Sequence, residues 1–342
     1  MENVFFYIAG LFLLAFAKAK SLLWGYRAPN AYDFSQIQRC VDYDIQVVDD
    51  WLSHLRSYDE TFSLKHKNVL EIGPTSDLGI GLYLLTKGCF QYSACDADDR
   101  MKTAPDALYR QLFSQLSRHE KQGEKQGQKQ GQKQGQKQGQ KQGQKQGQKQ
   151  GQKQGQSQGG EPGEKQQAAD FLKQQLAAAK AGYPSRLNII VRDEVDLVAA
   201  FGPATVDVVF SQMALEHFDD IDRMATQLSV VCKPDAILIA HVNLTLHSRW
   251  GHSRWMHEKD PNNMYRYPQS LYDLFEFRGI HNRLRPFQYQ AAFERAGWTN
   301  LSIYPISQRK MPAVSGFHKQ FATAQNQMDY LSIMICARNG DG

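Results

Sequence analysis

The sequence predicts an α/β fold, a doubly wound and mostly parallel sheet of seven strands whose last strand is reversed. Three observations predict it. Apolar runs of strand length alternate with helical periodicity from residue 41 onward. A loop with three glycines follows the first strand, where such folds bind ligands. Only a loop separates the last two strands, so the last can run antiparallel to its neighbour.

The elements follow in chain order within a single predicted domain, residues 28–338. The first helix, 41–57, has apolar groups at helical spacing, and the strands are short apolar runs bounded by turn residues. Helices are expected at 41–57, 79–87, 103–118, 166–181, 219–232 and 287–296, and strands at 68–72, 91–95, 187–191, 206–211, 236–242, 299–306 and 330–337.

The N-terminus, residues 1–27, predicts an apolar helix. Residues 4–17 are apolar on every side, and Lys18 and Lys20 follow them. Fourteen residues rise about 21 Å as a helix, less than the roughly 30 Å hydrocarbon core of a bilayer. We expect an anchor that contacts a membrane surface from the cytoplasmic side. A helix packed on its own domain, or a secretory signal that lacks the usual positive start, are the alternatives.

Residues 120–165 form a Lys-Gln-Gly-Gln repeat insert that we expect to be disordered. The insert holds ten Lys and four Glu, so the rest of the chain carries a charge of only −1 and no nucleic acid partner is expected. The five cysteines form no Cys-x-x-Cys pair, which favours reduced thiols in the cytoplasm.

The glycine loop indicates a nucleoside-bearing ligand. Gly73, Gly79 and Gly81 let the backbone approach a ligand, and Asp96 at the tip of the next strand can accept hydrogen bonds from ribose hydroxyls. Neither the P-loop pattern nor the Gly-x-Gly-x-x-Gly spacing is present. Glu71 disfavours a pyrophosphate and suits a cationic ligand, or alternatively holds the amides of the loop.

Five stretches resemble class I S-adenosylmethionine-dependent methyltransferases of the branch labelled type 11. They are VLEIGPTSDLGIG (69–81), YSACD (92–96), RDEVDL (192–197), VDVVFSQMALEHFDD (206–220) and KPDAILIAHV (233–242). The resemblance implies S-adenosyl-L-methionine as cofactor. It also implies a cradle in which Thr75 replaces the middle glycine, a contact of Asp193 with the adenine amino group, and Gln212 on the methyl-donor side.

The acceptor is expected under a cap formed by residues 244–286. Aromatic and basic groups in the cap offer contacts to a sugar or an anion. The residues predicted to contact the acceptor are Trp250, Arg283 and Arg285, together with Asn243 just before the cap. The alternative is that the arginines and aromatic residues, among them Tyr265 and Tyr267, are structural.

An oxygen acceptor requires a general base, for which His241 and then His217 are candidates, whereas an amine or carboxylate acceptor does not require one. The histidine spacing in the cap is no known zinc pattern, so no metal is expected.

The predicted function is methyl transfer from S-adenosylmethionine to a small or envelope-linked acceptor, such as a glycan or a lipid head group. A non-catalytic protein that binds the cofactor and is tethered to a membrane is the alternative from another class. An NAD-dependent enzyme of similar topology is the third hypothesis.

Overall fold

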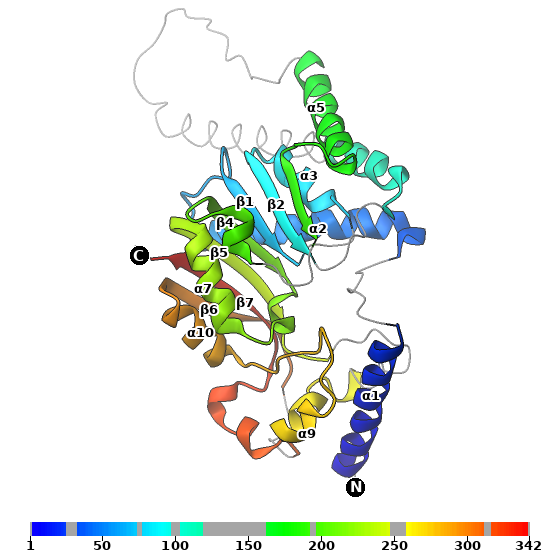
Figure 1. The fold of residues 1–342 in the computed structure, drawn as a ribbon, viewed down its shortest axis with the longest axis vertical. Helices are drawn as coiled ribbons and strands as arrows, with labels where there is room; N and C mark the ends of the chain where they lie inside the picture. The colour runs from blue at the N-terminus through cyan, green and yellow to red at the C-terminus, as the bar shows by residue number, and fades with distance from the viewer. Residues whose placement is uncertain are drawn as a thin grey trace, which may run out of the picture.

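The computed structural model describes residues 2–24, 33–73, 77–96, 103–118, 162–191, 196–246, 258–310 and 316–340. Seven strands form one sheet in the order β3-β2-β1-β4-β5-β7-β6 (Figure 1). Strand β7 runs antiparallel to both β5 and β6, and the other neighbours are parallel, which confirms the predicted fold class. The strands are β1 (Asn68–Ile72), β2 (Gln91–Asp96), β3 (Leu187–Val191), β4 (Val206–Gln212), β5 (Cys232–Asn243), β6 (Trp298–Gln308) and β7 (Tyr330–Asn339).

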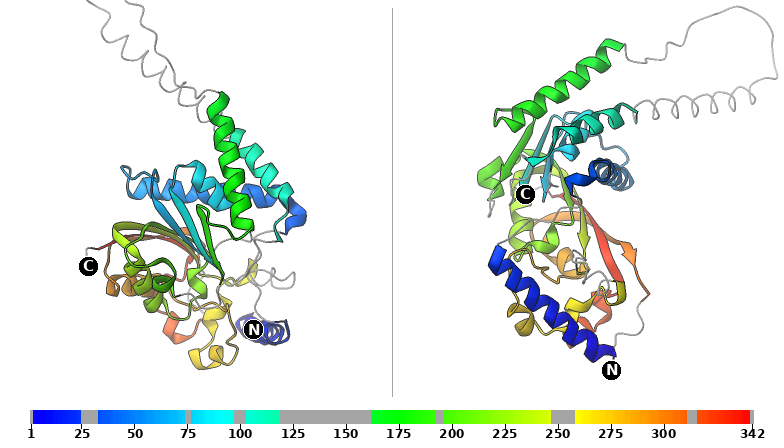
Figure 2. Two further views of the ribbon diagram at one scale, coloured as in Figure 1. Left: turned by 45° about the horizontal axis from the view of Figure 1, so that its top comes forward. Right: turned by 90° about the vertical axis from the view of Figure 1, so that its right-hand side faces the viewer.

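Helices cover both faces of the sheet (Figure 2). One face packs against α2 (Ile37–Tyr58), α3 (Gly79–Thr86), the helix at 106–118 and α5 (Pro162–Lys180). The other packs against α6 (Leu197–Phe201), α7 (Ile221–Val231) and α10 (Pro286–Arg295). Alternate residues of a strand reach opposite faces, so Phe210 stacks on Trp51 of α2 while Val209 joins the second core.

Two predicted boundaries differ from the structure for reasons that the sequence contains. Strand β5 begins at Cys232, where α7 has just ended, because Pro234 cannot continue a helix. The first turn of α5 begins at Pro162, inside the predicted insert, because proline is tolerated in the first turn of a helix. The rest of the insert, 119–161, lies outside the described residues.

The N-terminal helix is longer than predicted. Helix α1 spans Glu2–Trp24, about 35 Å at 1.5 Å per residue, because no proline or glycine interrupts the segment after residue 17. By length and composition alone, Asn3–Trp24 is the one helix among the described residues that could cross a membrane. The expectation that this segment is too short to span is therefore wrong.

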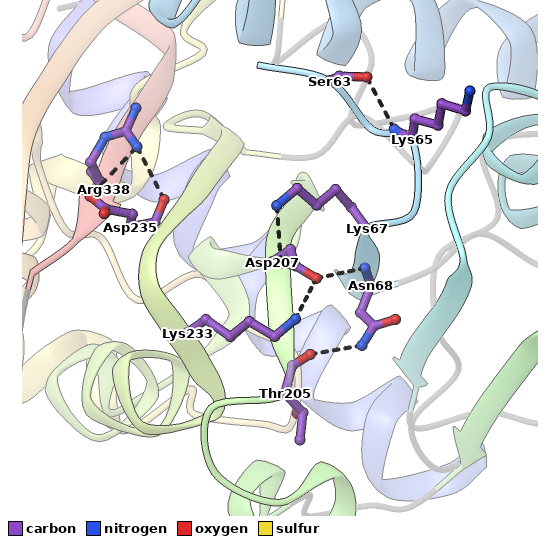
Figure 3. A network of polar contacts seen from close by, with 9 residues as sticks. All are labelled: Ser63, Lys65, Lys67, Asn68, Thr205, Asp207, Lys233, Asp235 and Arg338. Atoms are coloured by element: carbon purple, nitrogen blue, oxygen red, sulfur yellow. Dashed lines mark hydrogen bonds and ion pairs between the residues drawn. The ribbon is translucent and has the colours of Figure 1, made fainter. Parts of the chain in front are cut away.

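An ion-pair network fixes the amino ends of the central strands (Figure 3). The Asp207 carboxylate accepts hydrogen bonds from the ammonium groups of Lys67 and Lys233, at 3.3 and 2.9 Å, and from the backbone N–H of Asn68 at 2.9 Å. Burial opposes ionisation, yet these donors lower the pKa of Asp207 below its usual value. The network lies at the sheet edge opposite the glycine loop.

Candidate functional site

The residues predicted to hold a ligand meet at the carboxyl edge of the sheet. Ile72 of β1 pairs with Cys95 of β2 and Ser211 of β4, and Gln212 pairs with His241 of β5. One residue further along, the strands therefore place Asp96, Gly73, Gln212 and His241 in one row, which we call the carboxyl-edge row.

The turns after β1 and β4 are in direct contact. Gly73 adopts a φ of +73°, and a Cβ atom on it would lie 2.4 Å from the Cβ of Ala214. Its backbone N–H donates to the Cys95 carbonyl at 3.2 Å, which brings the turn beside the backbone of Asp96. The turn after β4 is strained, because Met213 has a side chain and adopts a φ of +51°. The N–H of Met213 donates to the His241 carbonyl at 2.8 Å. Glycine at position 73 is required by both conformation and space.

The two other loop glycines meet protein atoms closely. A Cβ on Gly79 would lie 1.9 Å from Oδ2 of Asp44, a residue of α2. A Cβ on Gly81 would lie 2.5 Å from the ring of Tyr92, so this glycine lets α3 approach the sheet. A direct contact of either with the cofactor stays a prediction.

Three buried carboxyl groups lie beneath the glycine loop. Glu71, Asp44 and Asp77 are at most 5% exposed. Glu71 accepts a hydrogen bond from the Tyr92 hydroxyl at 2.5 Å, and Asp77 accepts one from the Gly79 N–H at 2.7 Å. Burial raises the pKa of both aspartates, and the charge of Asp77 raises that of Asp44 further. Both aspartates therefore hold a proton more readily than a carboxyl group in water, and a nearby positive charge would favour their ionised forms.

Sequence reasoning missed Asp44 and Asp77. A signal was present for the first of them. Asp44 stands on the apolar stripe of α2, between Val41 and Val48, which are both fully buried. An acid on such a stripe is buried with its helix and requires a partner or a proton.

His241 is placed as a neutral group. Its Nδ1 lies 3.1 Å from the Gln212 amide nitrogen, and its Nε2 is buried without a hydrogen-bond partner among the described residues. Burial, together with the nearby His54, lowers the pKa of His241 to about 4. The ring is therefore unprotonated at neutral pH and can accept a proton. His217 lies in the short helix after β4, where its ring meets the edge of His281 with centroids 4.9 Å apart.

Arg285 and Arg283, which are both predicted to contact the acceptor, make structural contacts. Arg285 is 0% exposed, and its guanidinium donates to the carbonyls of Asn326, Gln327 and Tyr330 and to the Tyr265 hydroxyl. Arg283 is 2% exposed and donates to two backbone carbonyls and to Gln269. The guanidinium of Arg285 therefore has little left to offer an acceptor. The Nε atom of Arg283 is buried without a hydrogen-bond partner among the described residues, so a contact of this residue with the acceptor stays a prediction.

Other predicted contacts divide between structural roles and undescribed positions. The Asn243 amide is turned into its own loop, where it bonds the backbone and hydroxyl of Thr245. Tyr265 and Tyr267 are fully buried and belong to the core of the cap. Thr75, Asp193, Trp250 and the side chain of Asp96 lie outside the described residues. Within those that are described, no group of three or more His, Cys, Asp or Glu could hold a metal ion.

The sequence after the insert matches a known family. Residues 159–240 match the family model described as a methyltransferase domain. Over this stretch the chain resembles a methyltransferase domain. The matched range contains β3, β4 and most of β5, whereas the glycine loop and Asp96 lie before it.

Solved methyltransferases resemble the chain distantly. Phosphoethanolamine N-methyltransferase 2 from Haemonchus contortus is 11% identical with a TM-score of 0.42, over 86% of this chain and 53% of that one. A putative methyltransferase from Listeria monocytogenes is 13% identical with a TM-score of 0.40, over 86% and 98%. This chain thus spans about half of the length of the Haemonchus contortus protein. No curated protein matches this chain. Likeness at this level assigns no acceptor.

Proposed function

We propose that this methyltransferase transfers the methyl group of S-adenosylmethionine to a small molecule or to a group carried by a glycan or lipid. The observation that supports the proposal is the carboxyl-edge row. It joins the glycine turn, the strand tip at Asp96, and the Gln212–His241 pair on neighbouring strands. A nucleoside donor and an acceptor can therefore meet along one edge.

The residues at this edge fit the cofactor. Gly73 has no side chain of its own to block a ligand at the turn, and the Asp96 carboxylate would hold the ribose. The carboxyl groups of Glu71, Asp44 and Asp77 are buried beside the loop, and a nearby positive charge would favour the ionised forms of the two aspartates, whose pKa burial raises. This coupling favours the sulfonium of the donor over the neutral sulfur of the product, S-adenosylhomocysteine, and so assists product release.

The chain's part in the transfer is mainly to position the donor and the acceptor. S-adenosylmethionine supplies an activated methyl group, which an acceptor displaces in line. For an oxygen acceptor, the neutral ring of His241 would take the proton. An amine or carboxylate acceptor would need only orientation, with Gln212 fixing the ring beside it.

We further propose that the protein acts in the cytoplasm and contacts a membrane surface through residues 4–17. All five cysteines are buried and none of them forms a disulfide in the described part of the chain, which supports a reducing compartment. The apolar surface of α1 supports the membrane contact.

Calorimetry followed by a turnover assay tests the proposed function. Wild type should bind S-adenosylhomocysteine, and Asp96→Ala should weaken binding at least about tenfold, because it removes a charged acceptor worth 1.5–3 kcal/mol. The acceptor panel should contain amines, carboxylates and hydroxyl compounds, free and on vesicles. Binding without product across the whole panel would favour the non-catalytic protein. Binding of NAD that persists in Asp193→Ala, with no affinity for S-adenosylhomocysteine, would favour the dehydrogenase.

A further inference from the structure

Helix α1 has two faces of different character. The inner face carries Leu14 and Phe6, both buried, and packs into the core of the acceptor-side cap. We call the opposite side the outer face; its residues recur at three- and four-residue spacing. They are Val4, Phe5, Ile8, Phe12, Ala15, Phe16, Ala19, Leu22 and Leu23, and all are exposed.

Polar contacts hold the inner face against the cap. The Asn263 amide donates to the Phe6 carbonyl and the Tyr267 hydroxyl to the Tyr7 carbonyl, both at 2.9 Å. Gly10 allows this approach, because a Cβ there would lie 1.8 Å from Oδ1 of Asn263. At the other end of the helix, the Lys18 ammonium donates to the Leu274 carbonyl at 2.8 Å. A helix held at both ends in this way is part of the domain.

The cap connects α1 to the site. Tyr265, which lies in the same buried core as Leu14, donates its hydroxyl to the carbonyl of Leu244 at 2.9 Å. Leu244 directly follows the last residue of β5, three positions after His241. Figure 1 shows α1 and α9 (Gln269–Asp273) on the side toward which β1 and β2 point. The buried core on which α1 packs therefore also contacts the chain directly after β5, at the carboxyl edge of the sheet.

We propose that the outer face of α1 binds a lipid bilayer with the helix lying flat in the interface, so that the carboxyl edge of the sheet faces the membrane. The partner is the lipid surface, and the acceptor is drawn from the leaflet that α1 contacts. The second statement depends on the proposed function, whereas the first does not. A flat helix keeps every inner-face contact, whereas a spanning helix would leave the aromatic core of the cap without its cover.

A second copy of the chain fits the outer face less well than a bilayer does. From Val4 to Leu23 the face is about 29 Å long and one helix wide, so it forms a narrow convex ridge. Two convex ridges touch only along their line of contact and leave the flanks of both exposed, whereas the acyl chains of a bilayer surround the whole ridge. Leu274, 65% exposed beside Lys18, adds to the apolar surface, and a bilayer accepts such an uneven outline.

Vesicle flotation with the full chain tests the proposal. On phosphatidylcholine vesicles, with and without phosphatidylglycerol, wild type should float and an alkaline carbonate wash should release it. Phe12→Gln and Leu23→Gln should each lower the partition coefficient about tenfold, and together about a hundredfold, because both side chains are 72% exposed on the outer face. Phe90→Gln is the matched control, since Phe90 is 50% exposed at the opposite edge of the sheet and should leave flotation unchanged.

Four results would overturn the proposal that α1 lies flat in a bilayer. They are no flotation of wild type, unchanged flotation of the double variant, resistance of wild type to carbonate, and a lipid-free dimer that Phe12→Gln dissociates. Binding of S-adenosylhomocysteine is measured on the same samples. A protein that binds this nucleoside and ignores vesicles refutes the membrane contact alone, and one that floats without binding it refutes the proposed function alone.

Discussion

Replacing Arg285 by lysine separates a structural role from an acceptor contact. The guanidinium serves four oxygen atoms at 2.5–3.2 Å from three nitrogens, in a position with no solvent exposure. A lysine ammonium is a single centre and can reach two of these oxygens at most. Two buried acceptors then lose a charged donor at about 1–3 kcal/mol each, so Arg285→Lys should lower the free energy of unfolding by about 3–5 kcal/mol.

Urea denaturation followed by circular dichroism measures this loss. With a slope of about 3 kcal/mol/M, the midpoint should fall by 1 M or more. Arg295→Lys is the control, because its ion pair with Asp222 is exposed and should change stability by less than about 1 kcal/mol. The affinity of the folded variant for S-adenosylhomocysteine should stay within about twofold of wild type. An unchanged midpoint, with a raised KM for an identified acceptor, would refute the structural assignment.

Three further predictions concern the site and the opposite edge. Burial raises the pKa of Asp44 above its usual 3.8, so the contribution of this residue to stability is greatest at low pH and falls as the pH rises. Thermal melts between pH 4 and 8 should therefore show Asp44→Asn gaining stability relative to wild type. Asp207 has a lowered pKa, so its contribution is present at neutral pH and lost in acid, and Asp207→Asn should be destabilised most at neutral pH. If the stability difference from wild type changed with pH in the same direction for both variants, the environments assigned to the two aspartates would be wrong. Gly73→Ala should cost about 2–3 kcal/mol through strain and the Ala214 contact, and should weaken nucleoside binding in calorimetry at least tenfold. Wild-type affinity in this variant would show that the turn has room to move.

The sequence was most informative where periodicity and position determine structure. Strand β1 and the reversed last strand agree with prediction. A strand at the centre of a parallel sheet is a short apolar run with helices on either side, so it is easily recognised. The meeting of Gly73 with the backbone of Asp96 also follows from topology alone, since parallel strands end at a common edge. These features need no knowledge of side-chain packing.

The cap was predicted least well, because the residue types there do not reveal their partners. Arg285 and Tyr265 are a plausible acceptor-binding pair by composition, yet each is completely buried and they bond to one another. Only the packing of η6 (Ala324–Asn326) behind them, forty residues along the chain, supplies the carbonyls that occupy the guanidinium. Long-range contacts of this kind leave no periodic signal in the sequence.

Deletion of the repeat tests whether the insert takes part in the reaction. The helix at 106–118 and α5 are joined at the end nearer the sheet by the Lys180–Asp106 ion pair at 2.8 Å, and their leucines share one core. The 43 residues from 119 to 161 therefore connect the free ends of a helix pair that is already fixed. Removing residues 125–156 leaves 11 connecting residues, and the shorter loop should stabilise the fold by about 1 kcal/mol.

Calorimetry and thermal melts of the deletion variant provide the measurement. Its affinity for S-adenosylhomocysteine should stay within about twofold. The insert connects two helices, whereas the carboxyl-edge row is built from paired strands that do not contain it. A tenfold loss of affinity would mean that the lysines of the repeat act on the nucleoside. Unchanged affinity with weaker flotation on phosphatidylglycerol vesicles would instead assign the positive charge of the repeat to the anionic surface that α1 is proposed to meet.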